Sequence, residues 1–319
     1  MPSPNITDPE ISIVVPLYNE DESIGELFLQ IQQELEKNTT FEVIFVDDGS
    51  TDKSWEIIQS MRENHGSLVK GIRFRRNYGK SQALQKGFER AEGAYIVTMD
   101  ADLQDNPTEI LPMVDMLKDG LDLVSGWKQK RHDPISKTLP SLFFNFVTRK
   151  ATGIKLNDFN CGLKAYRKEV IRDIKLYGEL HRYIPYVAYQ QGYANIGEKV
   201  VEHRARKYGT SKFGFSRFIK GFLDLMTLLF LFHYMRRPMH FFGTAGTLFL
   251  GAGTLITAYL VVMRIFYEQY LSDRPLLLFG ILLMVLGVQF FSIGFLGELV
   301  NKNRIDNNEA DINIKDIIS

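Results

Sequence analysis

Cysteine is nearly absent from the 319-residue sequence, and charge of neither sign is in excess. The single cysteine, Cys161, excludes an intrachain disulfide and a zinc site built on several thiolates, and it fits a reducing compartment. The 38 basic and 38 acidic residues cancel, which argues against a nucleic-acid partner. Residues 1–10 also lack the basic stretch followed by an apolar run that marks a signal peptide.

Charged residues are also absent from two long stretches, residues 241–263 and 276–297. Each stretch exceeds the roughly 20 apolar residues that a helix needs to cross a bilayer. One such helix can be the core of a soluble protein, but two in succession favour a pair of transmembrane helices. Residues 264–275 carry charges of both signs and predict a short exposed loop between the two helices.

Basic residues flank these two stretches unevenly. Four lie at the outer ends and two in the loop: Arg236, Arg237, Lys302 and Arg304 against Arg264 and Arg274. Because Lys and Arg are enriched on the cytosolic side of membrane proteins, we expect both termini in the cytosol and the protein in the inner (plasma) membrane. A homo-oligomer formed through the membrane segment is compatible with this arrangement.

The chain therefore divides into four predicted parts. Residues 1–210 predict a soluble cytosolic domain, 211–235 an interfacial helix, 236–300 the two transmembrane helices with their external loop, and 301–319 a cytosolic tail. The second part mixes phenylalanines with basic residues directly before the first apolar stretch, which is typical of an amphipathic helix at a membrane surface. The alternative for this part is a helix packed on the soluble domain.

The first half of the chain alternates short apolar runs with helical patterns. Runs of strand length occupy residues 11–15, 43–46, 69–74, 95–99 and 121–124, and helical spacing covers 23–37, 54–65, 81–91 and 108–118. This repetition predicts an α/β domain, in which a Rossmann-like, mainly parallel sheet is covered by helices on both faces. Ligands of such sheets bind beyond the carboxyl ends of the strands.

Acidic residues cluster where the predicted strands end, at positions 20, 47–52 and 100–105. Some carboxylates at strand ends only cap the next helix and stay solvated, which is what we expect for Asp52 and Asp105. Others bind a cation and the polar edge of a ligand.

Asp100 and Asp102 favour the second role. Alternate residues of an extended segment point the same way, so both carboxylates can face one point. Two adjacent carboxylates raise each other's pKa unless a cation joins them. We therefore predict a divalent cation here, magnesium or manganese, with coordination positions left for substrate phosphates.

Six motifs, in this order, resemble the family-2 glycosyltransferases, specifically the dolichol- or polyprenyl-phosphate sugar synthases. They are Pro16-Leu17-Tyr18-Asn19-Glu20, Asp47-Asp48-Gly49-Ser50, Asn77-Tyr78-Gly79-Lys80, Asp100-Ala101-Asp102-Leu103-Gln104, Asn160-Cys161-Gly162-Leu163-Lys164-Ala165-Tyr166 and His203-Arg204-Ala205-Arg206-Lys207-Tyr208-Gly209-Thr210-Ser211-Lys212. With the two apolar stretches, the sequence looks closest to bacterial bactoprenol glucosyltransferases. Six ordered motifs are specific, whereas any one alone is not.

The resemblance implies a fold of the glycosyltransferase A (GT-A) type and a set of site residues. Nucleotide-sugar contacts are expected from Pro16, Tyr18, Glu20, Asp47, Asp48, Lys80, Asp100 and Asn160. Metal contacts are expected from Asp100, Asp102 and Gln104, and catalytic roles from Asp100, Asp102 and Asp158. Lys80 precedes a helix, where phosphate binds favourably, although a plain helix-start loop is the alternative.

A basic segment before the interfacial helix predicts the acceptor site. Arg206 and Lys212 offer charge-assisted hydrogen bonds to a lipid phosphate, and Ser211 adds a neutral donor. Lys128 is expected to contact the same phosphate, but it stands where many relatives have arginine, so a bidentate contact is weakened. Anchoring to anionic lipid headgroups is the alternative role for the segment.

The predicted reaction is inverting transfer of a hexose, first of all glucose, from a UDP-sugar to polyprenyl (undecaprenyl) phosphate. A phosphate acceptor is already ionised at neutral pH, so a strong base is dispensable and Asp158 is expected to position sugar hydroxyls or aid the acceptor. UDP-N-acetylglucosamine and other nucleotide sugars stay open as donors. A processive polysaccharide synthase is disfavoured, because neither Trp55 nor Trp127 lies in a Gln-x-x-Arg-Trp motif. An inactive nucleotide-sugar-binding scaffold is the other alternative.

Overall fold

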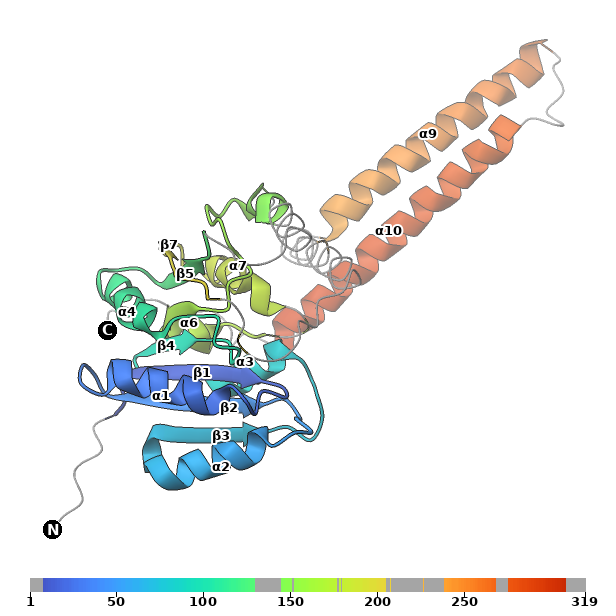
Figure 1. Ribbon diagram of the computed structural model, residues 1–319. Helices are drawn as coiled ribbons and strands as arrows, with labels where there is room; N and C mark the ends of the chain where they lie inside the picture. The colour runs from blue at the N-terminus through green and yellow to red at the C-terminus, as the bar shows by residue number, and fades with distance from the viewer. Residues whose placement is uncertain are drawn as a thin grey trace. The chain divides into compact units, whose positions relative to one another are not determined.

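The computed structural model describes residues 8–129, 145–150, 152–176, 178, 180–204, 207, 226, 238–267 and 275–307. The chain forms two compact units, Met1–Leu225 and Met226–Ser319 (Figure 1). The predicted interfacial helix at 211–235 lies, apart from Met226, outside the described residues.

Within the described residues the first unit contains a seven-stranded sheet in the order β3-β2-β1-β4-β6-β5-β7 (Figure 1). The strands are β1 (Ile11–Leu17), β2 (Phe41–Asp47), β3 (Val69–Arg73), β4 (Tyr95–Thr98), β5 (Leu123–Trp127), β6 (Lys164–Arg167) and β7 (Ile196–Val200). Strand β6 runs antiparallel to β4 and β5, and the other pairs are parallel. The predicted mainly parallel sheet is therefore confirmed.

Helices pack on this sheet close to where the sequence predicts them. They are α1 (Ile24–Leu35), α2 (Ser54–His65), α3 (Lys80–Phe88), α4 (Ile110–Lys118), α6 (Lys168–Asp173) and α7 (Ile184–Gln190), with short 3₁₀ turns η1 (Gly66–Leu68), η2 (Pro107–Glu109) and η3 (Leu180–Tyr183). The sequence patterns missed the short elements β6, β7, α6 and α7, which offer too few residues for a clear period.

The two faces of the central strand β1 explain why both sides of the sheet are covered. Ile13 and Val15 join the buried cluster that includes Phe28 of α1. Val14, between them, faces α3, because a Cβ atom added to Gly87 would lie 2.3 Å from its Cγ1. Glycine at this position therefore lets α3 approach the sheet closely. Because successive side chains of β1 point to opposite faces of the sheet, this one buried strand contacts a helical layer on each face.

The second unit contains α9 (Pro238–Tyr267) and α10 (Pro275–Asn307). Their apolar windows have mean hydropathies of 1.8 and 2.5 and are only 11% and 17% buried. Leucines on both helices are exposed, for example Leu255 at 73% and Leu278 at 71%. Helices this apolar and this little buried match membrane spans rather than the core of a soluble protein.

Small residues bring α9 and α10 together as an antiparallel pair (Figure 1). A Cβ atom at Gly253 would lie 2.6 Å from the Gly280 carbonyl oxygen, and one at Gly246 would lie 2.9 Å from that of Gly287. Such close backbone approach is how helices associate in lipid, where burial of apolar surface gives no driving force. Helix α10 continues to Asn307, past the start of the predicted tail at 301.

Candidate active site

The carboxyl ends of β2, β1 and β4 meet at one edge of the sheet. Leu17 at the end of β1 pairs with Asp47 at the end of β2, and Val14 pairs with Thr98 at the end of β4. The loops that follow carry the three acidic motifs predicted from the sequence. The structure therefore brings these motifs to the same edge, which is where parallel sheets bind ligands.

The two carboxylates after β2 order the neighbouring loops. Asp48 accepts hydrogen bonds from the backbone N–H groups of Tyr78 (2.7 Å) and Gly79 (2.9 Å), so it ties its own loop to the start of α3. Burial raises the pKa of Asp48, although the two N–H groups act in the opposite direction. Asp47 is fully buried and accepts from the Ser50 N–H at 2.7 Å, with the Arg73 guanidinium 3.4 Å away.

The loop after β1 docks on the loop after β2. Asn19 has a positive φ of 54°, and its backbone N–H donates to the Ser50 hydroxyl at 2.9 Å. The Asn19 side chain in turn accepts from the Thr51 N–H, and the Glu20 N–H donates to the Ser54 hydroxyl at 3.0 Å. Pro16 is buried, Tyr18 is half-buried, and both precede this docked turn. The predicted nucleoside residues are thus held on one connected frame.

Lys80 and Asp100 form an ion pair across this edge. Lys80 is the first residue of α3, and its ammonium donates to Oδ1 of Asp100. Burial alone would raise the pKa of Asp100, but the charge and hydrogen bond of Lys80 hold it at about 2. Gly162 leaves room for this carboxylate, because a Cβ atom there would lie 2.5 Å from its Oδ2. Asp100 is therefore ionised and fixed between two motifs.

The chain after β4 turns earlier than the sequence predicts. Strand β4 ends at Thr98, and residues 101–103 form a turn in which Leu103 has a φ of 61°. Asp102 accepts from the Gln104 N–H at 3.2 Å instead of lying on a regular extended segment. The expectation that alternation along a strand aligns the two carboxylates is therefore wrong, since both lie beyond the strand.

Gln104, an expected metal contact, pairs with the chain that follows β7. Its backbone carbonyl accepts from the Arg204 N–H at 2.9 Å, and its side-chain amide donates to the Arg204 carbonyl at 3.4 Å. The next residue, Asp105, forms an isolated antiparallel bridge with His203. The loop that carries Asp100 and Asp102 is thus docked on the segment that leads towards Arg206.

The donor set at this edge fits a divalent cation that is shared with a ligand. Among the described residues no group of three His, Cys, Asp or Glu side chains could enclose a metal ion. Magnesium is usually held by one or two carboxylates, with substrate phosphates and water completing its shell. Two carboxylates close together in the sequence, Asp100 and Asp102, suit this mode rather than an all-protein cage.

Asp105 is not the solvated helix cap that the sequence predicts. It is 1% exposed, and its Oδ1 lies 2.7 Å from the Nζ atom of Lys128. Among the described residues neither carboxylate oxygen has hydrogen-bond geometry to a partner, so the contact is an ion pair. Burial would lower the pKa of Lys128, but the surrounding negative charges, that of Asp105 foremost and that of Asp100 among them, together raise that pKa. The ammonium predicted to contact the acceptor phosphate is thus paired inside the protein.

A clamp holds the loop that carries Asp158 and Asn160. The carboxylate of Glu198, on β7, accepts hydrogen bonds from the backbone N–H groups of Asn157 (2.7 Å) and Asp158 (2.9 Å). It also accepts one from the side-chain amide of Asn157 (2.7 Å). Asp158 is 1% exposed and accepts from the Asn160 N–H at 3.1 Å, while Asn160 itself is exposed. The predicted sugar-contacting segment is therefore a fixed turn.

The structure adds His181, Ser81 and Lys164 to this region. The Ser81 hydroxyl accepts the His181 N–H at 3.0 Å and lies 3.1 Å from Nδ1 of the same residue. Burial, with the nearby Lys80 charge, lowers the pKa of His181 well below its ordinary value. No sequence pattern indicated that Ser81 and His181, which are 100 positions apart, lie together. Arg206, Ser211 and Lys212, predicted to hold the acceptor phosphate, lie outside the described residues.

Comparison with known proteins decides the family. The family model described as "Glycosyl transferase family 2" matches residues 12–175, which include all the strand-end carboxylates. The chain belongs to glycosyl transferase family 2. This glycosyltransferase is 38% identical over 300 residues to the dodecaprenyl-phosphate galacturonate synthase of Rhizobium johnstonii, with 91% of this chain and 87% of the relative covered. The prediction of a family-2 glycosyltransferase is confirmed.

Another relative matches most of the glycosyltransferase, and a solved structure shares its fold. An undecaprenyl-phosphate 4-deoxy-4-formamido-L-arabinose transferase of Pseudomonas aeruginosa is 33% identical, with 92% of this chain and 85% of the relative covered. A solved glucosyl-3-phosphoglycerate synthase of Mycobacterium tuberculosis superimposes with a TM-score of 0.55 at 18% identity, over 70% of this chain and 80% of that chain. The last similarity shows the fold alone and confirms the GT-A type.

Proposed function

We propose that this glycosyltransferase moves a sugar from a nucleotide sugar onto polyprenyl phosphate at the cytosolic face of the inner membrane. The observation that carries the proposal is the presence, in one chain, of the acidic sheet edge and the two scarcely buried apolar helices. The names of the relatives support it, since both acceptors are long-chain prenyl phosphates and the two relatives match 91% and 92% of the chain.

The proposed chemistry is a single displacement at the anomeric carbon. A phosphate oxygen of the acceptor attacks that carbon, and the bond from it to the nucleoside diphosphate breaks, so the configuration inverts and the product is β-linked. The acceptor phosphate has a second pKa of roughly 6 and brings its own negative charge, so no proton need be removed. The fixed turn at Asp158 then orients the sugar, with Asn160 exposed beside it.

The donor's nucleoside is proposed to lie against Asp47, Asp48 and the loop that ends at Glu20. Asp100 and Asp102 would hold a magnesium or manganese ion with the diphosphate, and such an ion neutralises charge that grows on the leaving group. Lys80 brings a second positive charge to the same place. The Mycobacterium tuberculosis synthase, which shares the fold, has been solved with Mn²⁺ and uridine diphosphate. That supports a uridine nucleotide and a divalent cation as the first choices.

The sugar is proposed to be a hexose, with UDP-glucose as the donor predicted from the sequence. The names of the two relatives give different sugars, a galacturonate and a modified arabinose, although the two sequences are similarly identical to this chain. Sugar identity therefore varies among close relatives, and the donor has to be found by trial. UDP-galacturonate and UDP-N-acetylglucosamine belong in the same trial.

A donor panel with purified full-length protein tests the proposal. Radiolabelled UDP-sugars are incubated with undecaprenyl phosphate and Mg²⁺ or Mn²⁺ in detergent, and label in the organic phase is measured. We expect one donor to label the lipid, and undecaprenol, which lacks the phosphate, to stay unlabelled. Label that appears only in a water-soluble polymer, or no lipid label with any donor while UDP binds normally, would contradict the proposed function.

A further inference from the structure

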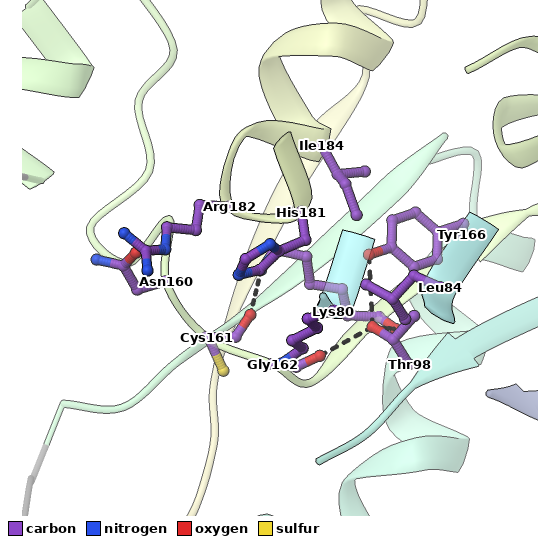
Figure 2. Close-up of a pocket in the computed structure, with 11 residues that line it drawn as sticks. Lys80, Leu84, Thr98, Asn160, Cys161, Gly162, Tyr166, His181, Arg182 and Ile184 are labelled. Atoms are coloured by element: carbon purple, nitrogen blue, oxygen red, sulfur yellow. Dashed lines mark hydrogen bonds between the residues drawn. The ribbon is translucent and has the colours of Figure 1, made fainter. Parts of the chain in front are cut away.

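A pocket next to the Lys80–Asp100 pair is lined by basic side chains. Lys80, Lys164, His181 and Arg182 contribute to its wall with Asn160, and none of the described residues that line it is acidic. Figure 2 shows the polar ends of Asn160 and Arg182 on one side of the pocket and the ring of Tyr166 on the other. A wall with this charge favours an anion over a neutral or cationic ligand.

Lys164 gives the pocket a buried positive charge that lacks a carboxylate partner. The residue is 3% exposed, and its ammonium donates to the carbonyl oxygens of Phe159, at 3.2 Å, and Cys161. Among the described residues no carboxylate forms an ion pair with it. A buried ammonium that is not paired with an anion is costly, and carbonyl dipoles offset only part of that cost. An anion in the pocket would supply the missing charge.

His181 presents a hydrogen-bond donor for the same purpose. The Ser81 oxygen already accepts the His181 backbone N–H, so the Ser81 hydroxyl proton is available for Nδ1 of the ring. This arrangement favours the tautomer in which Nε2 carries the proton. Arg182 follows directly and carries a planar guanidinium that matches two oxygens of a phosphate.

We propose that this pocket, with Arg182, His181 and Lys164 as its binding residues, receives the phosphate of the acceptor. The inference rests on the proposed function and deepens it. An alcohol acceptor would need a base, and none of the described lining residues is a carboxylate, whereas a phosphate needs positive charge and hydrogen-bond donors, which the wall has. Asn160 places the pocket beside the turn proposed to orient the sugar. The donor diphosphate has the same chemistry and is the competing occupant.

Binding of a short acceptor separates these two occupants without requiring turnover. Full-length protein in detergent is titrated with UDP, and then, with UDP and Mn²⁺ present, with farnesyl phosphate; farnesol is the control ligand. The variants are Arg182→Ala and Arg182→Lys. Arg172→Ala is the matched control, because Arg172 lies on α6 with its side chain 76% exposed. Thermal unfolding checks that each variant folds.

We expect Arg182→Ala to weaken farnesyl phosphate binding about 10- to 100-fold, as for loss of a charge-assisted contact, with UDP affinity unchanged. Arg182→Lys should weaken farnesyl phosphate binding less, because lysine keeps the positive charge although it lacks the planar guanidinium that can contact two phosphate oxygens. Arg172→Ala should match the wild type. If Arg182→Ala weakens UDP instead, the pocket holds the donor diphosphate, and if neither affinity changes, it is not a phosphate site; both results overturn the inference.

Failure of the proposed function has a different signature. Wild-type protein that binds farnesyl phosphate through Arg182 but transfers no sugar to undecaprenyl phosphate would refute the reaction and keep the pocket assignment. Wild-type protein that transfers sugar, with an Arg182→Ala variant of unchanged acceptor KM, would refute the assignment and keep the reaction.

Discussion

Asp105 and Lys128 form a buried ion pair that joins the acidic loop after β4 to the end of β5. The Asp105 carboxylate has no exposed surface, and the Lys128 side chain retains 14% exposure. Asp105 directly follows Gln104 and bridges to His203, so the pair anchors both the acidic loop and the chain after β7. Removing one partner would leave an uncompensated charge inside the protein.

We therefore expect Asp105→Asn or Lys128→Met to lower the free energy of unfolding by about 3–5 kcal/mol, as for other buried pairs that lose one member. The double variant Asp105→Leu with Lys128→Met should recover much of that loss. Lys86→Met is the control, because the Lys86–Glu89 pair is exposed and should be worth at most about 1 kcal/mol. Denaturant unfolding measures all four. A Lys128→Met protein of normal stability and raised acceptor KM would instead support the phosphate contact predicted from the sequence.

The cation site is tested at Asp102. Asp102→Asn keeps the size of the side chain and an acceptor oxygen for the Gln104 N–H but removes the charge, so the fold and membrane insertion should persist while turnover falls by several orders of magnitude. UDP affinity should no longer depend on Mn²⁺, which calorimetry with and without the metal measures. Asp52→Asn is the matched control, because Asp52 lies in a neighbouring turn, where it accepts the Ser54 N–H at 3.0 Å and the Asp21 N–H at 3.2 Å. Near-normal turnover of Asp102→Asn would refute the assignment.

The Glu198 clamp predicts an effect on turnover from outside the site. Glu198→Ala removes three hydrogen bonds from the turn that carries Asp158, and misplacement of a positioning group by about 1 Å can cost about 10²-fold in rate. We expect a fall in kcat with little change in UDP affinity. Glu198→Gln keeps one acceptor oxygen and should recover part of the rate. Equal losses in both variants, together with a lowered unfolding midpoint, would mean that the clamp only stabilises the fold.

We predict the orientation of the chain in the membrane from the uneven basic residues around the two apolar helices. A tag inserted near Ser272 should be accessible to reagents outside intact cells, and tags at the N-terminus and after Lys302 should be protected. Each tag is tested again after permeabilisation, when all three should react. A protected tag near Ser272 with an accessible C-terminal tag would reverse the orientation.

Most of the larger elements of the fold could be predicted from the sequence because their signals are local. Alternation in β1 and β2 and helical spacing in α1 and α2 each lie within a short window, and the acidic motifs follow the strands directly. The apolar helices α9 and α10 were equally easy to predict, because long uncharged runs of this kind are rare outside membrane-spanning helices.

The parts of the site that the sequence did not reveal depend on contacts between distant segments. Ser81 meets His181 across 100 positions, and Glu198 reaches the turn at Asp158 from another strand. Asp105 resembles a helix cap in the sequence, but in the structure it is buried and contacts Lys128 and His203, which follow β5 and β7. The turn at Leu103 was missed because a non-glycine residue gives little warning of a positive φ.

The products of one reaction test the central claim most directly. Purified protein is incubated with undecaprenyl phosphate and the best donor of the panel, and the lipid and the released nucleotide are both quantified by mass spectrometry. Transfer of the glycosyl group alone predicts a lipid that carries one phosphate and one sugar, with one UDP released per lipid formed. A lipid with two phosphates and released UMP, or UDP release that does not depend on the lipid, would contradict the account.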